Sequence, residues 1–173
     1  AWEWLSYLQK NNPNVPSLSQ KLSPINERRS LTKERDIWAN FIKNNKVKCI
    51  YSNKILSSDD FVIDHYLPWS FVAHNQAWNL IPVSKIDNAN KSDNLPSRET
   101  MCKFIDLQFI FLSTLLQNPE KKVYLKYLKS YEFDLNISKE ILCDHKSFTL
   151  SYSKVLNPLL EQAKNMGFNT YKN

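Results

Sequence analysis

Two segments in the middle of the chain are the most informative about its structure. Residues 62–71 have the sequence Val-Ile-Asp-His-Tyr-Leu-Pro-Trp-Ser-Phe, and residues 78–97 have the sequence Trp-Asn-Leu-Ile-Pro-Val-Ser-Lys-Ile-Asp-Asn-Ala-Asn-Lys-Ser-Asp-Asn-Leu-Pro-Ser. The first stretch opens with β-rich residues, and Pro68 prevents a long continuation of that strand. The second contains a short apolar segment at residues 80–83 and a potential short helix at residues 85–91. These stretches predict, in order, a strand, a loop, a strand and a helix.

Three polar side chains in these stretches suit phosphodiester chemistry. Asp64 offers a carboxylate and Asn88 an amide oxygen, and Mg²⁺ usually takes only one or two such ligands from protein and completes its shell with water and phosphate. His65 is the side-chain type whose unperturbed pKa lies near neutrality, so it can accept a proton from water. Because adjacent residues on a regular strand face opposite ways, Asp64 and His65 can share a site only where the strand ends or twists.

The expected helix places further polar groups beside this site. Asn88 and Lys91 lie three residues apart, and Asp87 and Lys91 lie four apart, so a helix brings them to one side. A surface ion pair with Asp87 is the simpler interpretation of Lys91. Support of the site is the alternative.

Together these positions resemble the HNH endonuclease motif over about residues 47–97. The tail Asn-Lys-Ser-Asp-Asn-Leu-Pro-Ser, residues 90–97, is similar to the HNH domain of the RNA-guided CRISPR type II nucleases. The upstream Lys-Cys-Ile-Tyr-Ser, residues 48–52, fits the part of the family pattern where members carry a hairpin turn. The other matching positions are Ile63, Asp64, His65, Pro68, Asn79, Leu80, Asn88 and Lys91.

The resemblance implies a role for each matching polar residue. Asp64 and Asn88 would bind a divalent metal ion, and His65 would be the general base. Asn79 would steady the loop that positions the base, and Lys91 would support the site or touch a phosphate. The implied cofactor is Mg²⁺, for which Mn²⁺ can substitute, and the implied reaction is metal-assisted hydrolysis of phosphodiester bonds.

The chain departs from the family pattern at a second metal site. Many HNH proteins bind a structural zinc ion through two Cys-x-x-Cys pairs, and the corresponding positions here hold Cys49, Ser52, Ser84 and Asp87. One cysteine in four positions cannot form a Cys₄ site, so we expect no structural zinc, with packing in its place. The last letter of the motif is Asn88 rather than His, which suits Mg²⁺ better than a soft metal. Asn90 lies close enough in sequence to be the alternative ligand.

Helices are expected on both sides of this unit. Residues 1–46 would form an N-terminal helical extension, which includes a helix capped by Thr32 and running to Asn44. Residues 98–173 would form a C-terminal helical region packed on the core at residues 47–97. Its helices are expected at residues 98–117, 119–129 and 152–166, with Gly167 as the C-cap. The predicted class is α+β, a ββα-metal (His-Me finger) core flanked by N- and C-terminal helices.

Charge and aromatic residues point toward nucleic acid. The chain carries a formal net charge of +6, which attracts polyanions. A basic cluster suited to phosphates gathers before and within the first helix, although a solvated surface explains it equally well; it consists of Arg28, Arg29, Lys33 and Arg35. Trp69 and Trp78 flank the site and can stack on bases. Core packing is the stronger interpretation of both tryptophans.

Composition excludes several other classes. Three widely spaced cysteines argue against a disulfide framework and favour a reducing cytoplasm, with Cys102 and Cys143 expected as buried thiols. No apolar run approaches the roughly 18 residues of a membrane span, so no membrane partner is expected. A single glycine excludes a P-loop and a Rossmann fingerprint. Because the chain begins with Ala1, further upstream domains or a partner protein are expected.

The leading functional hypothesis is therefore Mg²⁺-dependent hydrolysis of DNA in bacterial defence or mobile-element biology. One alternative is a nuclease that cleaves RNA, since the site recognises the phosphate rather than the sugar. A second alternative is a catalytically silent HNH scaffold that binds nucleic acid or a partner protein. The retention of Asp64, His65 and Asn88 argues against the silent scaffold.

Overall fold

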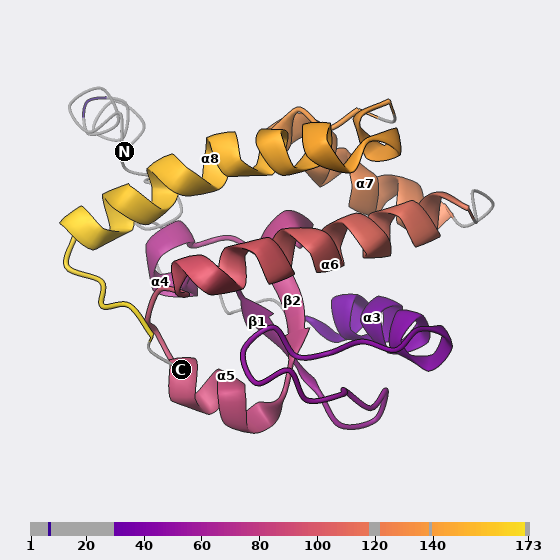
Figure 1. Cartoon of the computed structure of the whole chain (residues 1–173), viewed down its shortest axis with the longest axis horizontal. Helices are drawn as coiled ribbons and strands as arrows, with labels where there is room; N and C mark the ends of the chain where they lie inside the picture. The colour runs from indigo at the N-terminus through magenta and orange to yellow at the C-terminus, as the bar shows by residue number, and fades with distance from the viewer. Residues whose placement is uncertain (1–6, 8–29, 118–121, 139, 172–173) are drawn as a thin grey trace.

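The computed structural model of the chain describes residues 7, 30–117, 122–138 and 140–171 (Figure 1). Helices combined with a two-stranded sheet confirm the predicted α+β class. The elements, in chain order, are α3 (Thr32–Asn44), β1 (Val62–His65), α4 (Trp69–Val72), the 3₁₀ turn η1 (Ala77–Asn79), β2 (Leu80–Val83), α5 (Lys85–Lys91), α6 (Arg98–Leu116), α7 (Lys122–Leu135), the 3₁₀ turn η2 (Ile141–Cys143) and α8 (His145–Asn165).

The two predicted strands pair with each other. β1 and β2 are antiparallel, with Val62 opposite Val83 and His65 opposite Leu80. All four residues of β2 are buried, which explains its uninterrupted apolar sequence. β1 ends at His65, as the sequence required if Asp64 and His65 were to share a site. The predicted short helix follows as α5, and the side chain of Ser84 caps it by accepting a hydrogen bond from the backbone N–H of Asp87.

A narrow turn precedes β1 and lies against α5. The backbone of Lys48 pairs with that of Ile55, and Cys49 bonds to Lys54 through an N–H···O contact of 2.8 Å. Asn53 closes the turn with a φ of 58°, a left-handed conformation that Asn tolerates better than most residues. The hairpin turn implied by the resemblance is therefore present, and it carries the buried side chain of Tyr51.

The C-terminal helices cover the sheet and share its core. Figure 1 shows α6 crossing the molecule between the strands and α8. Trp38 of α3 stacks on Phe111 of α6 with ring centroids 3.7 Å apart, and Tyr66 after β1 stacks on Phe104 at 3.9 Å. Buried residues from all these elements form one hydrophobic cluster. The expected division of the chain after residues 46 and 97 remains a prediction.

The chain returns to the sheet side after α8. Met166 is the C-cap of that helix. Gly167, which was predicted as the cap, follows it with a φ of 91° and donates its N–H to the carbonyl of Lys164. The segment beyond it runs back beside the end of α5, because Leu95 donates to Asn169 and accepts from Tyr171, both at 2.8 Å. Figure 1 shows the segment after α8, in yellow, running back toward α5.

Several local expectations were wrong. Leu31, not Thr32, is the N-cap of α3, and Thr32 is the first helical residue. α7 runs to Leu135 rather than to residue 129, and α8 begins at His145, seven residues before the predicted start at residue 152.

The structure also bears on the cysteines, on membrane spanning and on the N-terminal extension. Cys102 and Cys143 are exposed, whereas buried thiols were expected. Among the described residues, no helix combines the length and apolar character needed to cross a membrane. Of the predicted N-terminal extension, residues 1–6 and 8–29 lie outside the described part.

The cap of α8 makes stability depend on pH. The Asp144 carboxylate accepts hydrogen bonds from the hydroxyl and the backbone N–H of Ser147, and these bonds lower the pKa of Asp144. A lowered folded-state pKa means that this stabilisation is present above the unfolded value of about 3.9 and is lost as the pH falls through the folded value. We expect Asp144→Ala to lower the melting temperature at neutral pH, with the deficit shrinking in acid.

Thermal unfolding of the wild type, Asp144→Ala and Asp144→Asn across this pH range tests the cap. Asn caps helices without titrating in this range, so Asp144→Asn should keep much of the stability at neutral pH but lose part of its acid dependence. Parallel curves for all three proteins would contradict the assignment.

Candidate active site

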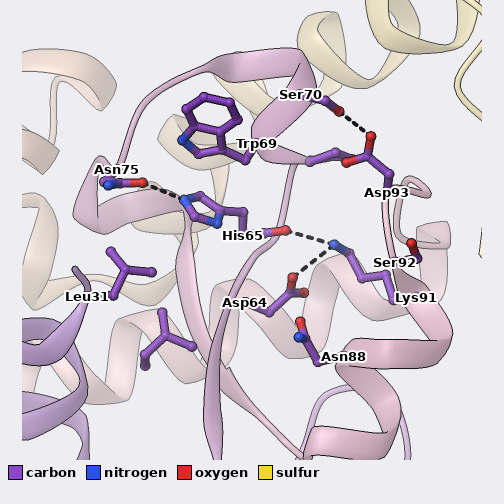
Figure 2. A pocket seen from close by; sticks show the side chains of 12 residues that line it. Leu31, Asp64, His65, Trp69, Ser70, Asn75, Asn88, Lys91, Ser92 and Asp93 are labelled. Atoms are coloured by element: carbon purple, nitrogen blue, oxygen red, sulfur yellow. Dashed lines mark hydrogen bonds and ion pairs between the residues drawn. The ribbon is translucent and has the colours of Figure 1, made fainter. Parts of the chain in front are cut away.

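A cavity of about 420 Å³ opens at the end of β1 (Figure 2). Its walls come from β1, the loop after it, α4, the start of α3 and α5. The sequence-predicted residues Asp64, His65, Asn88, Lys91 and Trp69 all line it, together with Leu31, Ile63, Pro68, Ser70, Asn75, Ser92 and Asp93. Asp64 and Asn88, which lie 24 positions apart in the chain, therefore meet in one pocket.

Asp64 is held from two sides within the protein. Its side chain is buried, and its Oδ1 accepts a hydrogen bond from Lys91 Nζ at 3.1 Å. Its Oδ2 accepts from the hydroxyl of Tyr51 at 3.0 Å. Burial raises the pKa of Asp64, while the ammonium of Lys91 and the hydroxyl of Tyr51 act in the opposite direction. The carboxylate is thus fixed in orientation at the pocket wall.

Lys91 is not the surface lysine that the sequence suggested. Its side chain is 1% exposed, and Nζ donates to Asp64 Oδ1 at 3.1 Å and to the backbone carbonyl of His65 at 2.8 Å. The two described residues Lys91 and Asp87 do not form the expected surface pair, because the Asp87 carboxylate accepts a hydrogen bond from Ser52 instead. A buried ammonium needs such partners, since removing a charge from water costs several kcal/mol. Lys91 therefore joins α5 to the end of β1.

His65 is oriented by a residue from the following loop. Its Nε2 lies 2.8 Å from Oδ1 of Asn75 (Figure 2). An amide oxygen can only accept, so with this orientation of the Asn75 amide the imidazole carries a proton on Nε2. Asn75 thereby helps to set the direction of the imidazole ring.

Asn79 connects η1 to the loop that follows His65. Its Oδ1 accepts from the backbone N–H of Leu67 at 2.8 Å, and its Nδ2 donates to the carbonyl of Leu67 at 2.9 Å. Its own backbone carbonyl accepts from the N–H of Tyr66 at 2.8 Å. Asn79 is fully buried, so these three bonds form away from water, and they fix the two residues directly after His65.

Asn88 and Asn90 differ in placement. Asn88 is half-buried and lines the pocket beside Asp64 and Lys91, as Figure 2 shows. Asn90 is exposed and does not line it. Asn88 is therefore the better placed of the two candidate ligands.

The four positions that correspond to a zinc site in other HNH proteins meet around one carboxylate. Oδ2 of Asp87 accepts from Cys49 Sγ at 3.0 Å, from Ser52 Oγ at 2.6 Å and from Ser84 Oγ at 2.6 Å. Burial opposes ionisation of Asp87, but these hydrogen bonds outweigh it and lower its pKa. Packing was expected in place of a zinc site, and here the four positions are joined by a hydrogen-bonded polar cluster centred on Asp87. It ties the turn that carries Tyr51 to the helix that carries Asn88.

The predicted nucleic-acid contacts are placed unevenly. Trp69 lines the pocket and is half-buried, whereas Trp78 is 3% exposed and belongs to the core. Arg35 lies over the ring of Phe61, with 5.0 Å from Cζ to the ring centroid, and Lys33 is exposed; neither lines the pocket. Arg28 and Arg29 lie outside the described residues.

Sequence reasoning missed three residues of the site. Tyr51 and Asn75 hold Asp64 and His65, and Asp93 lines the pocket while its Oδ2 accepts from Ser70 Oγ at 2.5 Å. Tyr51 and Asn75 lie in turns with no periodic pattern, so nothing local marks their partners. Asp93 lies within the family-like tail, and that placement was the one available signal.

The donor set suits a hard divalent cation. Asp64 and Asn88 present oxygen atoms to the same pocket, and each oxygen of a carboxylate has two lone pairs. Within the described ranges, no group of three or more His, Cys, Asp or Glu side chains could hold a metal ion. A cation here would rest on one carboxylate and one amide with water and phosphate around it, as Mg²⁺ commonly does.

One comparison with known proteins gives a match. Residues 49–97 match the HNH endonuclease family model, which supports the resemblance of this segment to the HNH family. HNH nucleases generally depend on a divalent metal ion. No curated protein and no solved structure shows significant similarity to the chain. The matched segment contains Asp64, His65, Asn79, Asn88 and Lys91.

The Asp87 cluster should contribute to stability. Asp87→Ala leaves the Cys49, Ser52 and Ser84 donors without their acceptor in a largely buried place, and we expect the free energy of unfolding to fall by about 1–3 kcal/mol. Urea unfolding measures this change.

Asp60→Ala is the matched control. Asp60 pairs with Lys85, which lies on α5 like Asp87, but the side chains of Asp60 and Lys85 are mostly exposed, at 72% and 65%. Loss of this ion pair should therefore cost less than about 1 kcal/mol. Equal effects of the two substitutions would contradict the importance of the cluster.

Proposed function

We propose that this HNH chain is a divalent-metal-dependent endonuclease that hydrolyses phosphodiester bonds in DNA, with the pocket at the end of β1 as its active site. The single observation that carries the proposal is the meeting of Asp64, His65 and Asn88 in that pocket. The three come from a strand end and a helix within the HNH-matched segment. We further propose that β1, β2 and α5 are the ββα-metal unit of the family.

Asp64 and Asn88 are proposed to hold the metal ion, Mg²⁺ or in its place Mn²⁺. When bound there, the ion would neutralise charge on the scissile phosphate and on the departing oxygen. Tyr51 and Lys91 keep the Asp64 carboxylate turned toward the pocket. The orientation of the ligand is then set before substrate arrives, which reduces reorganisation during the reaction.

His65 is proposed to be the general base. Because Nε2 donates to Asn75, Nδ1 is the nitrogen that takes the proton from the attacking water. The imidazolium that forms keeps its bond to the Asn75 oxygen, so the ring does not turn during the transfer. Asn79 supports this base through the two residues after it, and Lys91 supports it through the His65 carbonyl.

The substrate is proposed to be DNA, with Trp69 at the pocket wall as a candidate stacking surface for a base. Support comes from the net charge of +6 and from the exposed Lys33 near the start of α3. The proposed metal site and base would act on the phosphate rather than on the sugar, so the cleavage assay compares DNA with RNA.

Cleavage of supercoiled plasmid tests the function. We expect nicking or linearisation with Mg²⁺ or Mn²⁺, none with EDTA, and a fall of about 10²–10⁴-fold in rate for His65→Ala. His145→Ala is the control, because His145 is exposed and pairs with Asp106 on another part of the surface.

The same assay includes a matched RNA strand. Preferential cleavage of RNA would identify RNA rather than DNA as the substrate. Unchanged metal-dependent cleavage by His65→Ala would refute the role of His65 as general base. Binding of either nucleic acid without cleavage would favour the alternative of a catalytically silent scaffold.

The metal ligand is tested by a pair of neighbouring substitutions. Asn88→Ala should raise the Mg²⁺ concentration for half-maximal cleavage by about tenfold or more. Loss of a residue that only hydrogen-bonds to a metal ligand already weakens metal binding by about that factor. Asn90→Ala should leave it unchanged, since Asn90 is exposed and does not line the pocket. The reverse result would transfer the ligand role to Asn90.

A further inference from the structure

The C-terminal helices send buried polar side chains to one short backbone segment, residues 77–80. Gln108 of α6 donates through Nε2 to the carbonyl of Leu80 at 2.9 Å, and Tyr152 of α8 donates to the carbonyl of Trp78 at 2.9 Å. The hydroxyl of Tyr131 of α7 lies 2.8 Å from Gln108 Oε1 and 3.2 Å from the carbonyl of Ala77. Each of α6, α7 and α8 thus contributes one contact to a backbone carbonyl of this segment, and Asp134 of α7 also accepts a hydrogen bond from the Trp78 side chain at 2.7 Å.

These contacts lie away from water. Gln108, Tyr131 and Tyr152 are fully buried, and burial raises the pKa of both tyrosines well above the usual range, so their hydroxyls stay protonated as donors. Hydrogen bonds in such surroundings are strong and costly to leave unmade. They therefore fix the backbone of residues 77–80 rather than merely touch it.

The fixed segment includes Asn79. Its neighbours Trp78 and Leu80 are held by Tyr152 and Gln108, so the backbone on both sides of Asn79 is anchored to the helices. Asn79 then holds Tyr66 and Leu67, the two residues that follow His65. Hydrogen bonds and the backbone between them therefore connect the C-terminal helices to the two residues that follow His65.

We propose that Gln108, Tyr131 and Tyr152 are positioning residues for the active site, which act through Asn79 on the loop that carries His65. The inference rests on the proposed function. It assigns part of the active-site support to residues outside the segment matched by the family, residues 49–97.

A purely structural role predicts a different result. If the three side chains only satisfied buried carbonyls, removing a hydroxyl would lower stability and leave the rate of the folded enzyme unchanged. If they position the base, Tyr152→Phe should lower kcat by about ten- to hundred-fold with KM nearly unchanged, since small displacements of catalytic groups have large effects on rate. Tyr131→Phe should act in the same direction.

Tyr127→Phe is the matched control. Tyr127 lies on α7 one turn from Tyr131 and is buried, but its hydroxyl makes no hydrogen bond to residues 77–80. It should leave kcat within about twofold of the wild type, well below the tenfold that a positioning role implies. All rates are measured well below the melting temperature of each variant, so that partial unfolding does not contribute.

A double-mutant cycle tests the route through Asn79. If Tyr152 acts through Asn79, adding Tyr152→Phe to Asn79→Ala should change kcat no further. Full additivity of the two substitutions, or unchanged kcat in both tyrosine variants, would overturn the inference.

Amide hydrogen exchange gives a test that needs no activity. The backbone N–H groups of Tyr66 and Leu67 both donate to Asn79, so Tyr152→Phe should speed their exchange while Tyr127→Phe should not. If the wild type cleaves nothing but these amides lose protection, the nuclease function fails and the positioning contact stands. Unchanged protection in Tyr131→Phe and Tyr152→Phe overturns the inference whatever the activity.

Discussion

The pocket at the end of β1 depends on the buried ammonium group of Lys91. The ammonium of Lys91, 1% exposed, donates both to the Asp64 side chain and to the His65 backbone. A charge in this position is stable only with partners, because desolvation alone is strongly unfavourable. Asp64 needs Lys91 as well, because Asp64 is also buried and that burial raises the pKa of its carboxyl group. Helix α5 and the end of β1 are therefore held at a fixed separation, and Asn88 is carried on that helix.

Two further sets of hydrogen bonds fix the elements on either side of this pair. The Asp87 carboxylate joins the turn that carries Tyr51 to the start of α5, so Tyr51 and Asn88 are positioned from one point. Asn79 joins η1 to the loop after His65. Both sets link segments more than ten residues apart, and neither lies on a long regular element. The short strands alone would not hold this geometry, because an isolated two-stranded pair is only marginally stable in water.

How far the sequence could predict this arrangement depended on whether a signal was local. β2 and α5 were predicted at their observed bounds, because an apolar run and a capped helix leave signatures within a few residues. Asp64, His65, Asn88 and Lys91 reach one pocket, as the strand end and the helical spacing implied. The partner of Lys91 was not predictable in this way, since Asp64 lies 27 residues away and the choice between it and Asp87 is made by packing. Tyr51 and Asn75 were missed for the same reason. The early start of α8 did have a local signal, because Asp144 precedes Ser147 at the spacing of a helix cap.

Burial explains why so much of the support for the pocket lies outside the family-matched segment. Residues 77–80 are buried, and the 3₁₀ turn within them cannot satisfy all of its own carbonyl groups. The carbonyls of Trp78 and Leu80 take their donors from α8 and α6. Helix α6 is in turn held by the aromatic stacking of Phe111 on Trp38 and of Phe104 on Tyr66, and Phe104 also contacts the ring of Tyr152 on α8 edge to face. The same core that buries the aromatic residues therefore excludes water from the hydrogen bonds of Asn79. In such surroundings each bond is stronger and its geometry narrower than at a surface, so packing at residues far from the pocket sets how firmly His65 is held.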